Sequence, residues 1–225
     1  MKIVVLIDNT PDEEGRLISE HGLSMCIESA RIRILLDTGL SGSFIDNAKL
    51  LGVDLKNIDF CFLSHGHNDH CGGLRRWVET IPDTKAYLSE FILHEHYFSS
   101  HHSTKHNLSI DKKLLEEYAG RFVTIQENKW IAPDIAAVFC HTHDYPTPQG
   151  NLFLTKERDG IEKKDDFNHE MALVFKTQKG LVVFSACSHN GAINIMKCCE
   201  QFTGVHTITH FIGGLHFIDC NKTEE

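Results

Sequence analysis

The sequence predicts an α/β fold in which two β-sheets pack face to face and helices cover their outer faces. Short apolar runs alternate with segments of helical periodicity, and a weak internal repeat relates the two halves of the chain. The length of 225 residues, with 41% hydrophobic and 24% charged content, fits a compact domain with a sizeable core. We therefore expect residues 1–225 to form a single domain.

The first half of the chain is expected to open with a β-meander and to continue as alternating helices and strands. Apolar runs bounded by polar turns predict the strands, and apolar residues at helical spacing predict the helices. The predicted strands are residues 2–7, 24–28, 31–36 and 60–63, and the predicted helices are residues 44–51 and 74–80.

The middle of the chain is polar, and strands resume after it. Residues 87–120 are expected to be an insert or lid with two helices joined by the Ser/His-rich segment 99–106. After it, strands are predicted at residues 122–125, 135–139, 151–154, 171–176, 181–184 and 207–211, and a helix at residues 192–200.

The internal repeat joins two strand–helix–strand units. Asp37 and Cys187 follow the first strand of each unit, and His65 and His216 stand in the Gly/His loop after the second strand, at nearly equal spacing. Sheets packed face to face would bring these strand ends together. A metal site at that seam would need ligands from both halves of the chain.

The segment His65-Gly66-His67-Asn68-Asp69-His70 is the strongest functional signal. Imidazole nitrogens and a carboxylate are the ligands that suit zinc and related divalent ions. Glycines within and after the segment allow a tight turn that leads into a helix, which favours a metal loop over a solvated polar loop. The pattern predicts half of a two-metal site.

These motifs resemble those of the metallo-β-lactamase fold hydrolases, whose fold is an αββα sandwich of two mixed β-sheets flanked by helices. More narrowly, the chain is similar to the branch of 7,8-dihydropterin-6-yl-methyl-4-(β-D-ribofuranosyl)aminobenzene 5'-phosphate synthases. The residues that carry the resemblance are Asp8-Asn9, Glu20-His21-Gly22-Leu23-Ser24, Leu36-Asp37-Thr38-Gly39, residues 63–74, Ala186-Cys187-Ser188-His189 and Ile212-Gly213-Gly214-Leu215-His216.

The resemblance implies two divalent metal ions, zinc first and iron or manganese as alternatives. It implies that His65 and His67 bind the first ion, and that Asp69 and His70 bind the second and form the catalytic pair. His189 is expected as a further ligand, the alternative being a histidine that caps the helix at residues 190–192.

His216 is assigned from its place in the repeat, Cys187 from the resemblance, and Asp37 from the acceptor that ligating histidines usually need. His216 is expected to bind metal, to donate a hydrogen bond to a ligand or to contact substrate. In many members of the superfamily an Asp at the position of Cys187 bridges the ions, so Cys187 is either a thiolate ligand or a buried small residue. Asp37 is expected to accept hydrogen bonds that orient the metal loop, the alternative being a simple turn residue.

Other histidines are assigned to the substrate pocket or to solvent. We expect His21, Cys187 and the loop residues His141 and His143 to line a substrate pocket. The remaining histidines of the polar middle are expected to be solvated: His94, His96, His101, His102 and His106.

Composition excludes several classes of partner. The net charge of -9 argues against a general affinity for nucleic acid, and no apolar stretch approaches the length of a membrane span. The apolar N-terminal run meets Asp8 too early for a signal peptide. The eight cysteines lack disulfide-framework spacing, so we expect reduced thiols in a cytoplasmic protein with a small-molecule substrate. The sequence does not indicate an oligomeric state.

The expected function is hydrolysis of a small anionic ester or phosphoester by a metal-bound hydroxide. The alternatives are a pterin-related synthase that forms a carbon–nitrogen bond in folate-like or methanopterin-like metabolism, and a non-catalytic metal-binding or sensor protein. The resembled branch continues to a late P-x-H-C-T-G-like motif that carries a further His ligand, and this sequence ends at Glu225 without it. We therefore expect either that the fold lacks a C-terminal element or that His216 has taken over the role of the late ligand. On both alternatives the motifs predict metal binding more firmly than catalysis.

Overall fold

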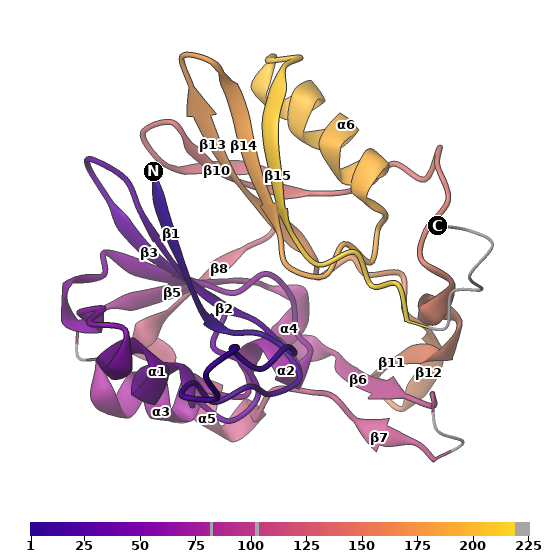
Figure 1. Ribbon diagram of the computed structural model, residues 1–225. Helices are drawn as coiled ribbons and strands as arrows, with labels where there is room; N and C mark the ends of the chain where they lie inside the picture. The colour runs from indigo at the N-terminus through magenta and orange to yellow at the C-terminus, as the bar shows by residue number, and fades with distance from the viewer. Residues whose placement is uncertain (82, 102–103, 219–225) are drawn as a thin grey trace. The chain divides into compact units, whose positions relative to one another are not determined.

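The computed structural model describes residues 1–81, 83–101 and 104–218 (Figure 1). The chain divides into two compact units. The first unit contains residues 1–88 and 108–124, and the second contains residues 89–107 and the chain from residue 125 onward. The polar middle predicted at 87–120 is thus shared between the units.

The first unit is built on a mixed sheet with strand order β1-β2-β3-β4-β5-β8. The pairs β1–β2 and β2–β3 are antiparallel, and β3–β4 and β4–β5 are parallel. These strands are β1 (Lys2–Ile7), β2 (Ser24–Glu28), β3 (Arg33–Leu36), β4 (Phe60–Phe62), β5 (Lys85–Ser89) and β8 (Phe122–Ile125). The helical segments are α1 (Phe44–Leu50), η1 (Leu55–Asn57), α2 (Asn68–Cys71), α3 (Leu74–Thr80), α5 (Lys112–Glu117) and η2 (Ala119–Arg121).

Helix α3 shows why these segments fold as they do. Leu74, Trp77 and Val78 recur at helical spacing and are buried, so the helix presents one apolar face to the core of the unit. The Trp77 ring lies 6.5 Å from Phe122 of β8, and the guanidinium of Arg121 lies over the Trp77 ring at 4.5 Å. These contacts fix helix α3, which follows α2 and the histidine loop of residues 64–67 in the chain.

The second unit contains a mixed sheet with strand order β15-β14-β13-β10-β9, in which β14–β15 is the parallel pair. Its strands are β9 (Lys129–Ala132), β10 (Ile135–Phe139), β13 (Met171–Thr177), β14 (Gly180–Ser185) and β15 (Ile208–Gly213). Helix α6 (Ala192–Thr203) covers this sheet and buries Ile195, Cys198 and Cys199 against it. All cysteines in the described part of the chain are free thiols, and most are buried as predicted.

An antiparallel sheet with order β12-β11-β6-β7 completes the second unit and was not predicted. It contains β6 (His96–Ser99), β7 (His106–Asn107), β11 (Leu154–Arg158) and β12 (Ile161–Lys164), and α4 (Phe91–His94) and η3 (Gln149–Phe153) adjoin it in the chain. Buried Lys156 of β11 donates hydrogen bonds to Glu95, Asp166 and Asn168, at 2.9, 2.5 and 2.7 Å. This network fixes the loop that follows β12.

The α/β class, the mixed sheets and most predicted elements are confirmed. The predicted strand at 151–154 is wrong for its first residues, because the chain there forms the 3₁₀ turn η3 directly after Pro148, with Asn151 N donating to Pro148 O. The two helices of the polar middle are α4 and α5, but strands β6 and β7 lie between them. Strand β7 consists of two exposed residues, and β6 has the adjacent aromatic residues Tyr97 and Phe98, so neither shows the apolar alternation that predicts a strand.

The internal repeat is confirmed in the topology. Strands β3 and β4 flank α1 and pair in parallel, and β14 and β15 flank α6 and pair in parallel. Because the ends of parallel neighbours lie at the same sheet edge, each unit brings the residues after its two strands together.

Candidate metal centre

The histidine loop of the first unit lies between β4 and α2. All residues from Ser64 to His67 are buried, and His67 takes the N-cap position of α2. The segment after residue 107 holds the loop from one side, because Asn68 N donates to Leu108 O at 2.7 Å and His67 pairs with Ser109 as an antiparallel bridge. The loop is therefore fixed by main-chain contacts before any ligand binds.

Asp37 is the acceptor around which this loop is organised. It is fully buried at the end of β3, with a left-handed φ of 58°. Its Oδ1 accepts from Ser64 N at 2.8 Å, and its Oδ2 accepts from Ser64 Oγ and from His70 Nδ1, both at 2.7 Å. The prediction that Asp37 orients the loop is confirmed, and the alternative of a simple turn residue is wrong.

These hydrogen bonds decide which imidazole nitrogens carry protons. A carboxylate can only accept, so His70 Nδ1 must carry the hydrogen that it shares with Asp37. Ser64 has one hydroxyl hydrogen and donates it to Asp37, so its oxygen accepts from His65 Nδ1 at 2.8 Å. In the neutral rings, Nε2 of both His65 and His70 then carries the lone pair that a metal ion needs.

Further side chains that could bind a metal ion lie close to His65 and His70. The His65 ring lies 4.7 Å from His67 and 4.3 Å from His70, measured between centroids. Oδ2 of Asp69 lies 3.3 Å from His70 Nε2 and 3.5 Å from Nε2 of the exposed His21. An imidazole lone pair and a carboxylate oxygen at this separation require a cation, either a metal ion or a proton.

Asp69 is held in its ionised form, which is the form that can bind a metal ion. Burial by itself would raise its pKa, but the neighbouring imidazoles of His70, His67 and His21 outweigh that effect and hold the pKa below its ordinary value. The side chain is therefore a carboxylate at neutral pH. Gly22 makes the approach of His21 possible, since a Cβ there would lie 1.9 Å from Asp69 O, and its φ of 129° favours glycine.

The second unit gathers Cys187, His189 and His216. Cys187 and His189 follow β14, and His216 follows the parallel strand β15. One ligand atom from each residue lies within 4.8 Å of the other two, and the His189 and His216 rings are 4.3 Å apart. Cys187 is half-buried, with Sγ 3.4 Å from His216 Nδ1, so it is not simply a core residue.

The main chain here is held in strained conformations. Ser188 and His216 have φ angles of 60° and 50°, which non-glycine residues rarely adopt. Buried Glu170 accepts hydrogen bonds from His189 N at 2.8 Å and from Asn190 N at 2.9 Å, although burial raises the pKa of this carboxyl. The N-cap of α6 is Gly191, so the alternative in which His189 caps that helix is wrong.

Two other predicted pocket residues of the second unit lie earlier in the chain, between β10 and η3. His141 and His143 are exposed in the loop after β10, and the His141 ring stacks on Phe139 at 6.1 Å. Their contact with substrate stays a prediction.

The histidines of the polar middle are only partly as expected. His94, His96 and His106 are exposed as predicted, and His102 lies outside the described residues. His101 is half-buried: its ring packs on Phe153 at 4.8 Å and lies 6.3 Å from His216. The expectation that His101 is solvated is wrong, and no sequence pattern distinguished it from its neighbours.

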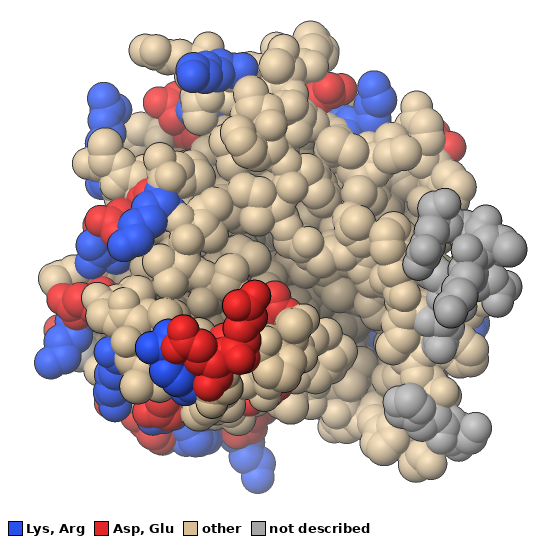
Figure 2. Space-filling model, viewed as in Figure 1, with Lys and Arg blue, Asp and Glu red and all other residues tan. Residues whose placement is uncertain are grey.

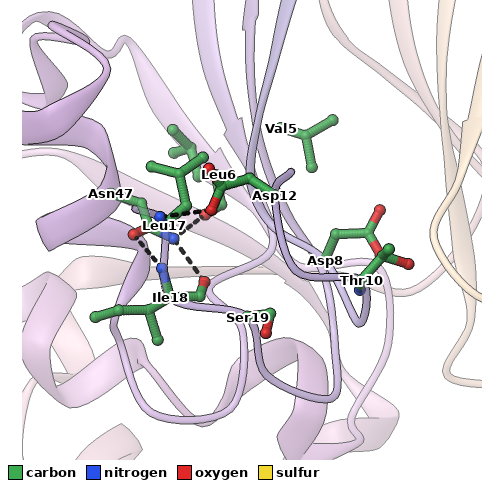
Figure 3. Close-up of a pocket in the computed structure, with 9 residues that line it drawn as sticks. All are labelled: Val5, Leu6, Asp8, Thr10, Asp12, Leu17, Ile18, Ser19 and Asn47. Carbon is green, nitrogen blue, oxygen red and sulfur yellow. Dashed lines mark hydrogen bonds between the residues drawn. The ribbon is translucent and has the colours of Figure 1, made fainter. Parts of the chain in front are cut away.

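A shallow pocket elsewhere in the first unit belongs to loop packing (Figure 3). Asn47 closes it by donating to Leu6 O and Ile18 O, and Asp12 accepts from Leu17 N. None of the predicted site residues lines this pocket.

Both histidine groups fit a divalent ion, because they combine imidazole nitrogens with a carboxylate in one unit and with a thiol in the other. The model of the metallo-beta-lactamase superfamily matches residues 20–166. The chain belongs to this superfamily. The metallo-beta-lactamase fold expected from the motifs is therefore established.

Two similar proteins extend over nearly the whole chain. The 7,8-dihydropterin-6-methyl-4-(beta-D-ribofuranosyl)-aminobenzene-5'-phosphate synthase of Methanocaldococcus jannaschii is 28% identical over 241 residues, which covers 99% of this chain and 79% of that protein. The crystal structure of Tm1679, a metal-dependent hydrolase of the beta-lactamase superfamily, matches with 29% identity and a TM-score of 0.80 over 99% of this chain and 79% of that one.

A more distant structure shares the fold alone. A quorum-quenching N-acyl homoserine lactone lactonase matches with a TM-score of 0.53 and 14% identity over 85% of this chain and 78% of that chain. The similar proteins that extend over nearly the whole chain thus include one described as a synthase and one described as a hydrolase.

Proposed function

We propose that the chain is a metal-dependent hydrolase that acts on a small anionic ester or phosphoester. The observation that carries the proposal is the hydrogen bonding of His65 and His70. His70 Nδ1 donates to Asp37, and His65 Nδ1 donates to Ser64, which Asp37 orients, so that the lone pair of each neutral ring lies on Nε2, the nitrogen proposed to bind metal. The likeness to Tm1679, described as a metal-dependent hydrolase, supports it.

The proposed ligands are His65, His67, Asp69 and His70 in the first unit and His189 and His216 in the second. Divalent ions supply Lewis acidity and lower the pKa of bound water from about 15.7 to about 7. Two ions and zinc are proposed, with iron or manganese as alternatives that accept the same ligands. A metal-lined site attracts anions even in an acidic protein, which supports an anionic substrate.

Asp69 and His70 are proposed as the catalytic pair. The depressed pKa of Asp69 keeps its side chain ionised at neutral pH, so that it can accept a hydrogen bond from a water, and His70 is locked against Asp37 beside it. His21, whose Nε2 is 3.5 Å from Asp69, is proposed to contact substrate at the exposed side of that carboxylate.

A pterin-related synthase is the second candidate. It is supported by the likeness to the synthase of M. jannaschii over 99% of this chain. Such an enzyme would form a carbon–nitrogen bond between a pterin pyrophosphate and an aminobenzene partner, and a direct condensation assay distinguishes it from a hydrolase.

The test combines metal content with hydrolysis. Purified protein is analysed for zinc, iron and manganese and assayed on p-nitrophenyl phosphate, bis-p-nitrophenyl phosphate and p-nitrophenyl acetate, before and after removal of metal by a chelator. We expect bound metal, loss of hydrolysis on chelation and recovery on adding Zn²⁺. His67→Ala should remove metal and lower hydrolysis at least about 100-fold, whereas His106→Ala, an exposed histidine of β7, should leave both unchanged.

Full turnover by metal-free protein would overturn the proposal. Retained metal without hydrolysis of any ester would favour the synthase if condensation is observed, and a non-catalytic metal-binding protein if it is not.

A further inference from the structure

Asn151 makes a two-point contact with His189. The side chain projects from the 3₁₀ turn η3, and its Nδ2 donates to the main-chain oxygen of His189 at 2.7 Å. Its Oδ1 lies 3.1 Å from His189 Nδ1. Both residues belong to the second unit, and His189 is almost fully buried.

These two contacts determine the tautomer of the ring. The main-chain oxygen of His189 can only accept, so the amide nitrogen of Asn151 must face it, which turns Oδ1 toward the ring. Oδ1 can also only accept, so His189 Nδ1 must carry a hydrogen. The lone pair of the neutral ring then lies on Nε2.

A separate contact sets the plane of the ring. Phe167 stacks on His189 with centroids 4.5 Å apart and an interplanar angle of 3°. Phe167 is itself held with a left-handed φ of 51°, and its main-chain nitrogen donates to Asp165 Oδ1 at 2.8 Å. Asn190 Nδ2 also donates to Phe167 O at 3.2 Å. Phe167 therefore fixes the plane of the His189 ring, and Asn151 determines which of its nitrogens carries the hydrogen.

We propose that Asn151 is a positioning residue that holds His189 in the Nδ1–H tautomer and thereby reserves Nε2 for a metal ion. Asn151 does for His189 what Asp37 does for His70, through a neutral acceptor in place of a charged one. The inference rests on the proposed metal-dependent function. The tautomer itself is a property of the metal-free protein.

The experiment reads the tautomer and the metal affinity separately. Long-range proton–nitrogen NMR spectra of metal-free, ¹⁵N-histidine-labelled full chain at about pH 8, assigned to His189 by comparison with His189→Gln, should show the Nδ1–H form. In Asn151→Ala the ring should shift toward Nε2–H, and Zn²⁺ affinity in competition with a chelating dye should fall about 10-fold to 100-fold.

Asn151→Asp separates the two contacts. It keeps an acceptor for His189 Nδ1 but loses the donor to the His189 main-chain oxygen, so it should retain the Nδ1–H form and bind Zn²⁺ more tightly than the alanine variant. Equal losses of Zn²⁺ affinity and of the Nδ1–H form in both variants would show that Asn151 merely anchors the main chain, and would overturn the proposal. Leu152→Ala, on the same turn with an exposed side chain, should behave as wild type.

The wild-type spectrum is decisive even if a variant fails to fold, because an Nε2–H form there overturns the proposal directly. An Nδ1–H spectrum in wild-type protein that binds no metal would instead count against the proposed function, so the two failures are distinguishable.

Discussion

Asp37 concentrates three hydrogen bonds on one buried carboxylate. Oδ1 accepts a hydrogen bond from the main-chain nitrogen of Ser64, and Oδ2 accepts from both the Ser64 hydroxyl and the His70 ring. Through Ser64 it also fixes His65. One acidic residue at a strand end therefore sets the protonation pattern of two proposed ligands through Oδ2, while its Oδ1 holds the main chain of the loop.

Asp37→Asn should disturb this pattern with little change in shape. The amide has one acceptor oxygen, so its NH₂ group must face either Ser64 or the His70 Nδ1–H, and asparagine tolerates the left-handed φ of 58°. We expect Zn²⁺ affinity to fall about 10-fold to 100-fold and stability to fall by about 1–3 kcal/mol. Competition with a chelating dye and urea unfolding measure these changes.

Asp12→Asn is the matched control, because Asp12 also accepts main-chain hydrogen bonds, from Leu17 N and Arg16 N, but does so in the exposed loop of Figure 3. It should leave Zn²⁺ affinity unchanged. Wild-type affinity in Asp37→Asn would contradict the assigned role.

At the scale of elements, the same strand–helix–strand unit is used twice. In the first unit the ends of β3 and β4 join Asp37 to Ser64, and in the second the ends of β14 and β15 join Cys187 to His216. The parallel pairing produces these contacts, because it places both loops at one edge of the sheet. The loops differ in sequence, but their positions are set by the same topology.

The end of β15 depends on a glycine. Gly213 has a φ of 139°, and a Cβ there would lie 1.9 Å from Ser185 O of β14. Gly213→Ala should therefore lower the stability of the second unit by about 3 kcal/mol and displace His216, because the clash is with main chain and cannot be relieved by a rotamer change.

Gly204→Ala provides the control for left-handed strain alone. Gly204 closes α6 with a φ of 68° and has open space around its Cβ position, so alanine there should cost only about 1 kcal/mol. The midpoints of urea unfolding measure both variants. Equal losses of stability in Gly213→Ala and Gly204→Ala would contradict the close approach of β15 to β14 at Gly213.

At the scale of the whole molecule, charge argues against nucleic acid as a substrate. The net charge is -9, and on the face shown in Figure 2 the Lys and Arg side chains are scattered, with Asp and Glu side chains beside many of them. No helix in the described residues has the length and apolar character needed to cross a membrane. Cytoplasmic location stays a prediction.

We expect no binding to a fluorescently labelled single-stranded RNA in 0.15 M salt at protein concentrations up to about 10 μM, because non-specific affinity comes from clustered Lys and Arg that neutralise phosphates. Fluorescence anisotropy measures it. A salt-sensitive rise in anisotropy below that concentration would show a basic surface that binds RNA and would contradict this expectation.

Much of the fold was predictable because its apolar patterns are regular. Strands β1, β2, β8 and β10 and helix α3 have the predicted bounds, since each couples a periodic apolar pattern to clear turn residues. Strands β7 and β12 were missed because their residues are exposed, and β6, in which Tyr97 is buried, was missed because four residues are too few to show a period. Pairing with neighbouring strands stabilises the sheet that contains them.

The fold class, the strand–helix–strand repeat and the residue types of a metal centre could be predicted from the amino-acid sequence, because periodicity and motif spacing involve residues that are close in the chain. Which nitrogen of each histidine carries a proton could be read only from the folded chain. That choice depends on acceptors distant in the chain, Asp37 for His70 and Asn151 for His189. The tertiary structure also places His101 near His216. This proximity results from packing between segments that are distant in the chain, so no local sequence pattern predicts it.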